Sequence, residues 1–293
     1  MSVTDACAAL GYSRQAYYQP LSERKRLCDA DLKKLKDHVE KERKRCPTRG
    51  CREMYERYRG PLPIGRDSCI RLLMKMGYRV RFPKRFGKAT QSGTRMFPNL
   101  LVDRKLTGIN QVWQADMAHY LYGDRKYYTI YITDVYNQEI IGFGAYSTNE
   151  AVNYADVLKK AIGLRKISCK ALDDLIHHGD GGKQYESWLY TTLCKENGIR
   201  QSMCMYSYEN PYAEKTNDLI NNGYLNIWRP KSLKDLIICQ KKAVKDHNEN
   251  SRKKILGKIS PIDFRDALST SKQSYILDLK PKNPEQPRKR VSL

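Results

Sequence analysis

Residues 111–120 read QVWQADMAHY, and the alternation of apolar and polar side chains in this stretch predicts a β-strand. Successive side chains of a strand point to opposite faces of its sheet. The apolar face of this strand would carry Trp113, Ala115 and Met117. Gln114 and Asp116 would share the other face, so we expect an acidic side chain in the middle of the strand, on its polar side.

The sequence that follows continues with β-rich runs and then alternates between helix and strand. Residues 126–136 and 139–147 predict two further strands joined by a hairpin-like link. The later segments are expected as a helix at 148–165, a strand at 173–178, a helix at 183–198, a strand at 199–205 and helices at 210–228 and 232–252. This order indicates an α/β fold with a mixed five-stranded sheet flanked by helices.

Three acidic side chains occupy positions that predict a site on this sheet. They are Asp116 in the first strand, Asp180 just after the fourth strand in LIHHGDGGKQYES (175–187), and Glu214 in the first turn of a later helix. Open α/β sheets place ligand groups beyond strand ends, so neighbouring first and fourth strands would bring the two aspartates side by side. Three converging carboxylates repel one another unless divalent cations such as Mg²⁺ lie among them, as in two-metal phosphoryl chemistry.

Each of these acids also has an ordinary structural interpretation. An Asp after a strand is usually a turn or cap residue, and a Glu in a first helical turn usually meets the helix dipole. Asp134 is expected to be a hairpin-corner residue of this kind. Neighbouring histidines on a strand point to opposite faces, so the nearby histidines are expected to pack or to support the pocket; they are His119, His177 and His178.

The chain is strongly basic, with 54 Lys and Arg against 32 Asp and Glu. Residues 1–100 hold 24 of these basic residues and 10 of the acidic ones, so the positive charge is concentrated at the front. This indicates a polyanionic partner, because Lys and Arg that bind phosphates release condensed counterions. A surface that is merely solvated, or nonspecific RNA binding, is the alternative.

Cysteine usage and hydropathy exclude several other classes of protein. The nine cysteines form no CxxC pair, which argues against a zinc ribbon and a disulfide framework and fits reduced thiols. The chain opens with no signal-peptide pattern, and no apolar run approaches the length that spans a membrane. We therefore expect a cytoplasmic, nucleoid-associated protein with no membrane partner.

The basic front part is expected to be helical and to bind DNA. Residues 3–18 predict two short helices that expose Arg14, and a charged helix follows at 22–45. A helical pair with a tight link would be a helix-turn-helix with Arg66 and Arg71 at a groove, or else an ordinary helical hairpin. The stretch after it contains Gly, Pro and the basic residues Lys84 and Arg85, and could track a phosphate backbone. The predicted regions are an N-terminal helical region at 1–46, a helix-turn-helix-like domain at 47–80, a basic linker at 81–107, a core at 108–265 and a disordered basic tail at 266–293.

Five stretches together resemble the retroviral-integrase-like transposases, most closely the second-frame protein of bacterial insertion sequences with two overlapping reading frames. The stretches are QVWQADMAHY, YITDVYNQEIIGF, HHGDGGKQYES, ENPYAEKTNDLI and HNENSRKKILGKISPIDF, in the family's order. The resemblance runs from about residue 45 to 265. It implies an RNase H-like fold, and the family's catalytic Asp, Asp and Glu, which bind Mg²⁺ or Mn²⁺, fall on Asp116, Asp180 and Glu214.

The chain departs from the family pattern around these acids. Gly179 stands where the family usually has Ser, and Gly181 where it often has a bulkier or polar residue. The interval between the second and third acid holds 33 residues, slightly fewer than usual. After the Glu the family favours Arg, here Lys215, and two turns further on Lys, here Asn221, so a contact with the DNA end is expected to be weaker.

The prediction is therefore a DNA transposase that cleaves the 3′ end of an insertion sequence and transfers the freed strand to target DNA. The resemblance implies an oligomer that holds two transposon ends, and an upstream-frame partner protein. A DNA-binding regulator of the same fold that no longer cleaves is the alternative, and a metal-dependent nuclease without strand transfer is a third possibility.

Overall fold

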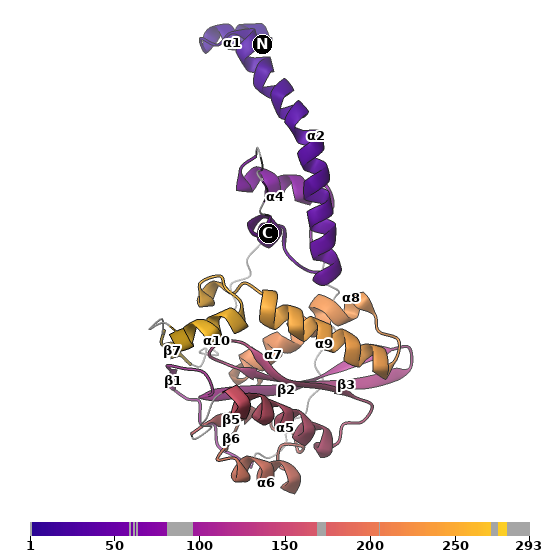
Figure 1. Ribbon diagram of the computed structural model, residues 1–293, viewed down its shortest axis with the longest axis vertical. Coiled ribbons are helices and arrows are strands. Elements are labelled where there is room, and N and C mark those ends of the chain that lie inside the picture. The colour runs from indigo at the N-terminus through magenta and orange to yellow at the C-terminus, as the bar shows by residue number, and fades with distance from the viewer. Residues whose placement is uncertain are drawn as a thin grey trace. The chain divides into compact units, whose positions relative to one another are not determined.

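The chain folds into two compact units, Met1–Phe82 and Pro83–Leu293 (Figure 1). The computed structural model describes residues 2–58, 60, 62, 64–80, 96–168, 174–204, 206–270 and 275–279, without the side chains of 16, 19–30, 166–168, 207 and 269–270. None of the helices in these ranges combines the length and the apolar content that crossing a bilayer requires.

The first unit is helical. Its helices are α1 (Val3–Ala9), α2 (Arg14–Arg45), α3 (Cys51–Arg57) and α4 (Arg66–Lys75). A small core joins the C-terminal half of α2 to α3 and α4, and its buried side chains are Leu35, Val39, Cys51, Met54, Cys69 and Leu73. The two helices predicted over 13–18 and 22–45 are one continuous helix, α2, which runs through position 20 despite the low helix propensity of the proline there.

The second unit is built on a mixed five-stranded sheet, as predicted, with the order β4-β3-β2-β5-β6. The strands are β2 (Val112–Tyr122), β3 (Arg125–Asp134), β4 (Ile140–Tyr146), β5 (Ile176–Gly179) and β6 (Arg200–Met203). The first three form an antiparallel meander, and β5 and β6 run parallel to β2. The first and fourth predicted strands, β2 and β5, are therefore neighbours.

Helices cover both faces of this sheet (Figure 1). One layer contains α5 (Ala151–Ser168) and α6 (Trp188–Glu196). The other contains α7 (Pro211–Asn217), its π-helical continuation η2 (Asp218–Leu225), α8 (Asn226–Trp228), α9 (Leu233–Asn250) and α10 (Pro261–Thr270). The main core lies under α5 and α6, where Trp113 and Ala115 are buried and Met117 packs against them, so the predicted apolar face of β2 is confirmed.

Segments that the sequence assigned to a linker and a tail belong partly to this unit. A short antiparallel pair joins β1 (Lys105–Leu106) to β7 (Leu277–Asp278), and Leu106 and Leu277 are buried in a second core. The expected boundary at 265 falls inside α10. Apolar residues in both segments explain the difference, since burying them against the sheet is favourable. The predicted linker residues Lys84 and Arg85 and the tail from 280 lie outside the described residues.

Asp134 is more than the corner residue that the sequence suggested. Its carboxylate accepts a hydrogen bond from the backbone N–H of Tyr136, as a corner residue does, and another from Asn110. It is also fully buried against Arg165, at 3.4 Å, and Arg165 reaches Glu139 at 3.0 Å. Burial raises the pKa of Asp134 to about 6, against the opposing effect of the arginine. This acid is part of a buried ion network.

Candidate active site

The pairing of β2 with β5 decides where the two aspartates lie. The strands are parallel, and Gln114 is opposite His178. Asp116, inside β2, and Asp180, just after the end of β5, each lie two residues further along, so they reach the same level on neighbouring strands. Glu214 comes from α7, which packs against β2 and β3 on the polar face of β2. The three acids predicted from the sequence therefore come from two strands and one helix that are in contact.

Asp180 and Glu214 are each close enough to Asp116 to affect its charge. Burial raises the pKa of Asp116 to about 7, and the negative charges of Asp180 and Glu214 contribute to that shift. Burial also raises the pKa of Asp180. No Lys or Arg among the described residues contributes to either shift. Two carboxylates with raised pKa values, such as Asp116 and Asp180, favour binding either a proton or a cation.

The hydrogen bonds of the two aspartates hold their orientation and leave acceptor capacity. Oδ1 of Asp116 accepts from the backbone N–H of Met117 at 2.9 Å, and Oδ2 accepts from Nδ2 of Asn217 at 2.8 Å. Oδ1 of Asp180 accepts from the backbone N–H of Gly182 at 3.2 Å. Each carboxylate oxygen has two lone pairs, so each of these oxygens can accept a further bond.

The chemistry of this donor set fits a hard divalent cation, although the acids are not gathered into a ready-made site. Mg²⁺ and Mn²⁺ prefer carboxylate oxygens, which all three residues offer. Within the described residues, no group of three or more His, Cys, Asp or Glu side chains is close enough to hold one ion. Mutual repulsion is expected to keep like charges apart when no cation lies among them.

Helix α7 is anchored to β2 by Gln114, the residue that shares the polar face of the strand with Asp116. The side-chain oxygen of Gln114 accepts hydrogen bonds from the backbone N–H groups of Tyr212 at 3.0 Å and Ala213 at 3.4 Å. These groups lie in the first turn of α7 and have no partner within the helix. The buried glutamine thus caps the helix and places Glu214, one residue further on, over the strand.

Two asparagines complete this anchor. Nδ2 of Asn210, the residue before α7, donates to the backbone oxygen of Ala115 at 2.9 Å. Asn217, in the last turn of α7, donates to Asp116 as described above. No sequence pattern assigned Gln114, Asn210 or Asn217 to the site. Only the position of Gln114, two residues before Asp116 on the same face, was a signal that could have pointed to one of them.

Gly179 and the tyrosines beside it explain one departure from the family pattern. A Cβ at Gly179 would lie 3.3 Å from the ring of Tyr185, which is buried in the main core. Burial and the charges of Asp180 and Asp116 raise the pKa of Tyr154 on α5, so this phenol also lies close to both acids. The glycine leaves room for aromatic packing directly under Asp180, while the acid itself is retained.

His177 and His178 are packing residues, as preferred from the sequence. His177 and His178 are both buried; Nε2 of His177 is 2.5 Å from the hydroxyl of Tyr190, and Nδ1 of His178 is 2.8 Å from Oγ of Ser202. Burial lowers the pKa of His177 to about 3 and that of His178 to about 4, so both rings are neutral at pH 7. His119 is exposed and lies edge-on to Tyr128.

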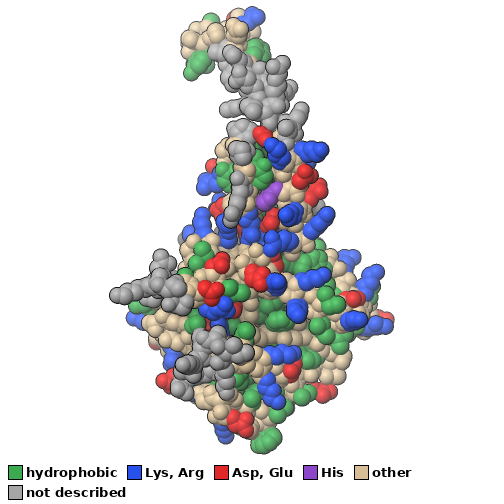
Figure 2. All heavy atoms as spheres, viewed as in Figure 1, with side chains coloured by type: hydrophobic (Ala, Val, Ile, Leu, Met, Phe, Trp, Pro, Cys, Tyr) green, Lys and Arg blue, Asp and Glu red, His purple; other side chains and the backbone are tan. Residues whose placement is uncertain are grey.

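The residues predicted to bind DNA have different surroundings. Arg14, Arg66 and Arg71 are exposed on the first unit, where Arg66 pairs with Asp67 at 2.9 Å and Arg71 donates to Ser68 at 3.3 Å. Lys215 is exposed on α7. Figure 2 shows Lys and Arg interspersed with Asp and Glu on the visible face of each unit, so no single patch stands out there.

Asn221 does not lie where a DNA contact was expected. Its side chain is buried; its oxygen accepts from the hydroxyl of Tyr131 at 3.2 Å, and its Nδ2 donates to Oγ1 of Thr129 at 3.4 Å. The expectation assumed two α-helical turns after Glu214. Because η2 is π-helical, each residue is rotated less about the axis, and Asn221 turns toward the sheet.

Comparison with known proteins supports the family resemblance found in the sequence. Residues 107–206 match the family model described as an integrase core domain. The 31 kDa protein of insertion element IS600 from Shigella sonnei is 30% identical over 271 residues, which cover 89% of this chain and 97% of that protein. A putative transposase for the element IS986/IS6110 from Mycobacterium tuberculosis is 28% identical over 168 residues, 56% of this chain and 60% of that transposase.

Among solved structures, the catalytic core domain of HTLV-2 integrase in complex with magnesium aligns with a TM-score of 0.40 and 20% identity, over 55% of this chain and 95% of that chain. The sequence similarity to the IS600 protein is nearly full-length, and the integrase core segment contains both Asp116 and Asp180. This chain belongs to the family of insertion-sequence transposases that carry an integrase core domain.

Proposed function

We propose that this protein is an active DNA transposase, which cleaves a strand at the 3′ end of an insertion sequence and joins that end to target DNA. Both reactions are displacements at phosphorus: a water is the nucleophile in the first, and the freed 3′-hydroxyl is the nucleophile in the second. The observation that carries the proposal is that Asp116 and Asp180 lie at one level of neighbouring strands, with Glu214 close enough to contribute to the raised pKa of Asp116.

Asp116, Asp180 and Glu214 would hold Mg²⁺, or Mn²⁺ in its place. When bound, the divalent cation supplies Lewis-acid stabilisation of the oxygens that carry charge in phosphoryl transfer. The raised pKa of Asp116 means that the ion competes with a proton, so binding is expected to weaken below pH 7. The same acidic cluster, without an ion, would repel a DNA phosphate.

The other residues of the site would hold the acids in place. Gln114 fixes the start of α7, and Asn217 orients the Asp116 carboxylate, so Glu214 and Asp116 keep their relative position. This preorganisation matters because misplacement of a reacting group by about 1 Å can cost about a hundredfold in rate. Asn217 and Gln114 are positioning residues in this scheme.

DNA would be held largely by phosphate contacts. The exposed residues Arg14, Arg66 and Arg71 of the first unit and Lys215 on α7 remain our proposed contacts, and Asn221 is withdrawn because it is buried. We also propose that the protein acts as a homo-oligomer on two transposon ends, with an upstream-frame partner, in the bacterial cytoplasm at the nucleoid.

The departures from the family pattern do not favour a regulator that has lost activity. Gly179 accommodates the ring of Tyr185, and Asn221 bonds the sheet, so both have packing roles that leave the acids untouched. We therefore keep the transposase as the proposal.

A strand-transfer assay on supercoiled plasmid with Mg²⁺ tests the proposal. Donor DNA carries the ends of the element that encodes the protein, and Asp180→Asn is compared with Asp174→Asn. Both variants remove one carboxylate charge with little change in volume, but Asp174 is 86% exposed and lies before β5. Joined products should form with wild type and Asp174→Asn, and should fall by at least about a thousandfold with Asp180→Asn, several kcal/mol of transition-state stabilisation.

Each other outcome of the assay rejects the proposed activity in a specific way. Cutting without joining would identify a nuclease. DNA binding with neither cutting nor joining, in wild type as in Asp180→Asn, would identify a regulator.

A further inference from the structure

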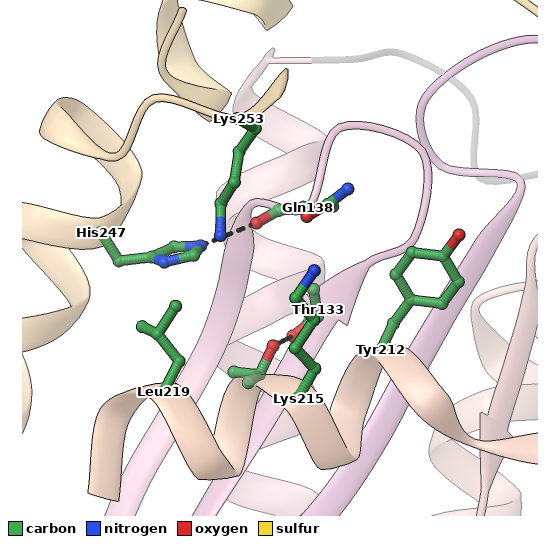
Figure 3. A pocket seen from close by; sticks show the side chains of 8 residues that line it. Thr133, Gln138, Tyr212, Lys215, Leu219, His247 and Lys253 are labelled. Atoms are coloured by element: carbon green, nitrogen blue, oxygen red, sulfur yellow. Dashed lines mark hydrogen bonds between the residues drawn. The ribbon is translucent and has the colours of Figure 1, made fainter. Parts of the chain in front are cut away.

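A polar pocket lies on the side of α7 opposite to Asp116, Asp180 and Glu214. Its space, about 240 Å³ with the open solvent at its mouth included, lies between α7, the C-terminal end of β3, the end of α9 and the segment before the short helix η3 (Lys254–Leu256) (Figure 3). Tyr212, Lys215 and Thr216 line it from α7. Residues three and four apart share a helix face, whereas Glu214, two residues from Tyr212 and from Thr216, faces elsewhere.

Two lysines bring positive charge to this pocket. Figure 3 shows the side chain of Lys215 rising from α7 and that of Lys253 descending from the segment before η3 toward the same space. Both ammonium groups are close enough to His247 to lower its pKa, although burial is the larger cause. No Asp or Glu is among the described residues that line the pocket. The lysine charges therefore face a space without a lining carboxylate.

His247 adds no charge of its own. Its Nε2 is 2.9 Å from the backbone oxygen of Gln138, and because a carbonyl can only accept, this nitrogen carries the proton. Nδ1 faces the hydroxyl of Ser251 at 3.4 Å. The ring is buried, and its pKa is lowered to about 3, so it is neutral at pH 7. It forms a fixed wall of the pocket.

Neutral donors complete the lining. Oγ1 of Thr133 and Oγ1 of Thr216 are 2.9 Å apart, and such a bond uses one hydroxyl proton and leaves the other able to donate. The phenol of Tyr212 keeps its proton, since burial raises its pKa. Gln138 presents a side-chain amide, which also has two N–H donors. Two cations and several neutral donors around one open space match an anion with several oxygens.

We propose that this pocket binds a phosphate group of the DNA backbone, held between Lys215 and Lys253. Lys253 has no role in the functional site described above, and the assignment of DNA as the source of the phosphate rests on the proposed function. Thr133 pairs with Gln114, two residues from Asp116 on the same face of β2, so the pocket and the acids are separated by the width of α7. A strand that crosses α7 would reach both.

DNA binding is measured with the full-length protein and a short duplex of arbitrary sequence, in EDTA, over a series of salt concentrations. Each B-DNA phosphate neutralised contributes about 0.9 to the slope of log K against log salt. If the two lysines share one phosphate, the double variant Lys215→Gln/Lys253→Gln should lose about 0.9 of slope, and each single variant less. A double variant that loses nothing would overturn the proposal. A loss of about 1.8 would indicate two separate phosphates and would also overturn it.

Three further variants test whether the change in the salt-dependence slope is specific to the two lysines of the pocket. Lys195→Gln, an exposed lysine of α6 in the layer on the opposite face of the sheet, should leave the slope unchanged, and an equal loss there would contradict the pocket. The double arginine variant should keep the slope, because the charge is kept. Lys215 is exposed, so Lys215→Gln alone is expected to fold and still lower the slope even if the double variant does not fold.

A further measurement with inorganic phosphate distinguishes a DNA phosphate from free phosphate as the ligand of the pocket. Inorganic phosphate is compared with chloride at equal ionic strength by thermal unfolding. A phosphate-dependent rise in Tm of wild type, absent in the double variant, together with an unchanged DNA slope, would assign the pocket to free phosphate and overturn the DNA proposal. These binding and unfolding measurements use EDTA and involve no DNA cleavage. The pocket proposal can therefore be rejected while strand transfer is observed, and strand transfer can be absent while the pocket binds phosphate.

Discussion

The two faces of strand β2 are formed by alternate residues of one segment and differ in chemistry: one face is apolar and the other is polar. Trp113 and Ala115 are fully buried under α5 and α6, where close packing is sufficient. On the other face Gln114 and Asp116 are polar, and each is satisfied by a particular partner on α7. The apolar face is stabilised by area removed from water, whereas the polar face depends on hydrogen-bond geometry.

This difference between the two faces indicates how the strand can include an acid that lowers the stability of the fold. Asp116, with a raised pKa, destabilises the fold when it is ionised, and the packed face opposite can offset that cost. The anchor on α7 then fixes where the acid points. Substitutions on each face separate the two contributions.

Trp113→Ala should cause the largest loss of stability. The side chain is fully buried in the main core, and its indole N–H donates to Asn110 at 3.2 Å. Removing a buried Trp costs about 3–5 kcal/mol in the free energy of unfolding. Urea unfolding followed by circular dichroism measures it. Leu121→Ala, at a site 67% exposed on the same strand, should change stability by less than about 0.5 kcal/mol. Equal effects at both sites would contradict the assignment of the core face.

Asp116→Asn should stabilise the metal-free protein at high pH. The folded protein holds the Asp116 proton more tightly than the unfolded chain, with a pKa of about 7 against 3.8, so stability falls as pH rises between these values. Because the side chain is half-buried, we expect a gain of about 2 kcal/mol at pH 8, which shrinks toward zero below pH 4. Unfolding in EDTA at several pH values measures it.

The matched control for this pH effect is Asp124→Asn, in the exposed turn between β2 and β3. It should show no comparable gain at any pH. If Asp116→Asn were neutral or destabilising at pH 8, the acids would not be the electrostatic cost on this face that their raised pKa values indicate.

Gln114→Leu should have the smallest effect on global stability and a local one on α7. It removes the acceptor of the Tyr212 and Ala213 amides and leaves these donors without that partner, at a cost of about 1–2 kcal/mol. Hydrogen exchange of these two amides should become faster, while the amides of α5 remain protected. Unchanged protection at Tyr212 and Ala213 would show that the glutamine does not hold the helix.

The strands and the candidate acids could be predicted because their signals are local. Alternation along 111–120 assigned the faces of β2, and the position of Asp180 after a strand placed it at a sheet edge. The helix that carries Glu214 was expected at 210–228, where the proline at position 211 suits a first helical turn. The resemblance to the family added the order of these stretches, which no single motif could establish.

Other features depended on contacts between segments far apart in the chain. The pairing of residues 105–106 with 277–278 joins two segments that composition assigned to a linker and a tail. Asn221 turned inward because η2 departs from α-helical spacing, and its hydrogen bonds to β3 have no local signature. Lys215 and Lys253 share a pocket only because α7 and the segment after α9 pack together.

The amino-acid order alone predicts on which face of its own helix or strand each acidic, apolar or cationic residue lies, because side-chain periodicity is set by the local backbone. Which of these faces meet depends on packing between segments far apart in the chain. Packing and buried hydrogen bonds select one arrangement among many, and they placed Gln114 under α7 and brought Glu214 within electrostatic reach of Asp116.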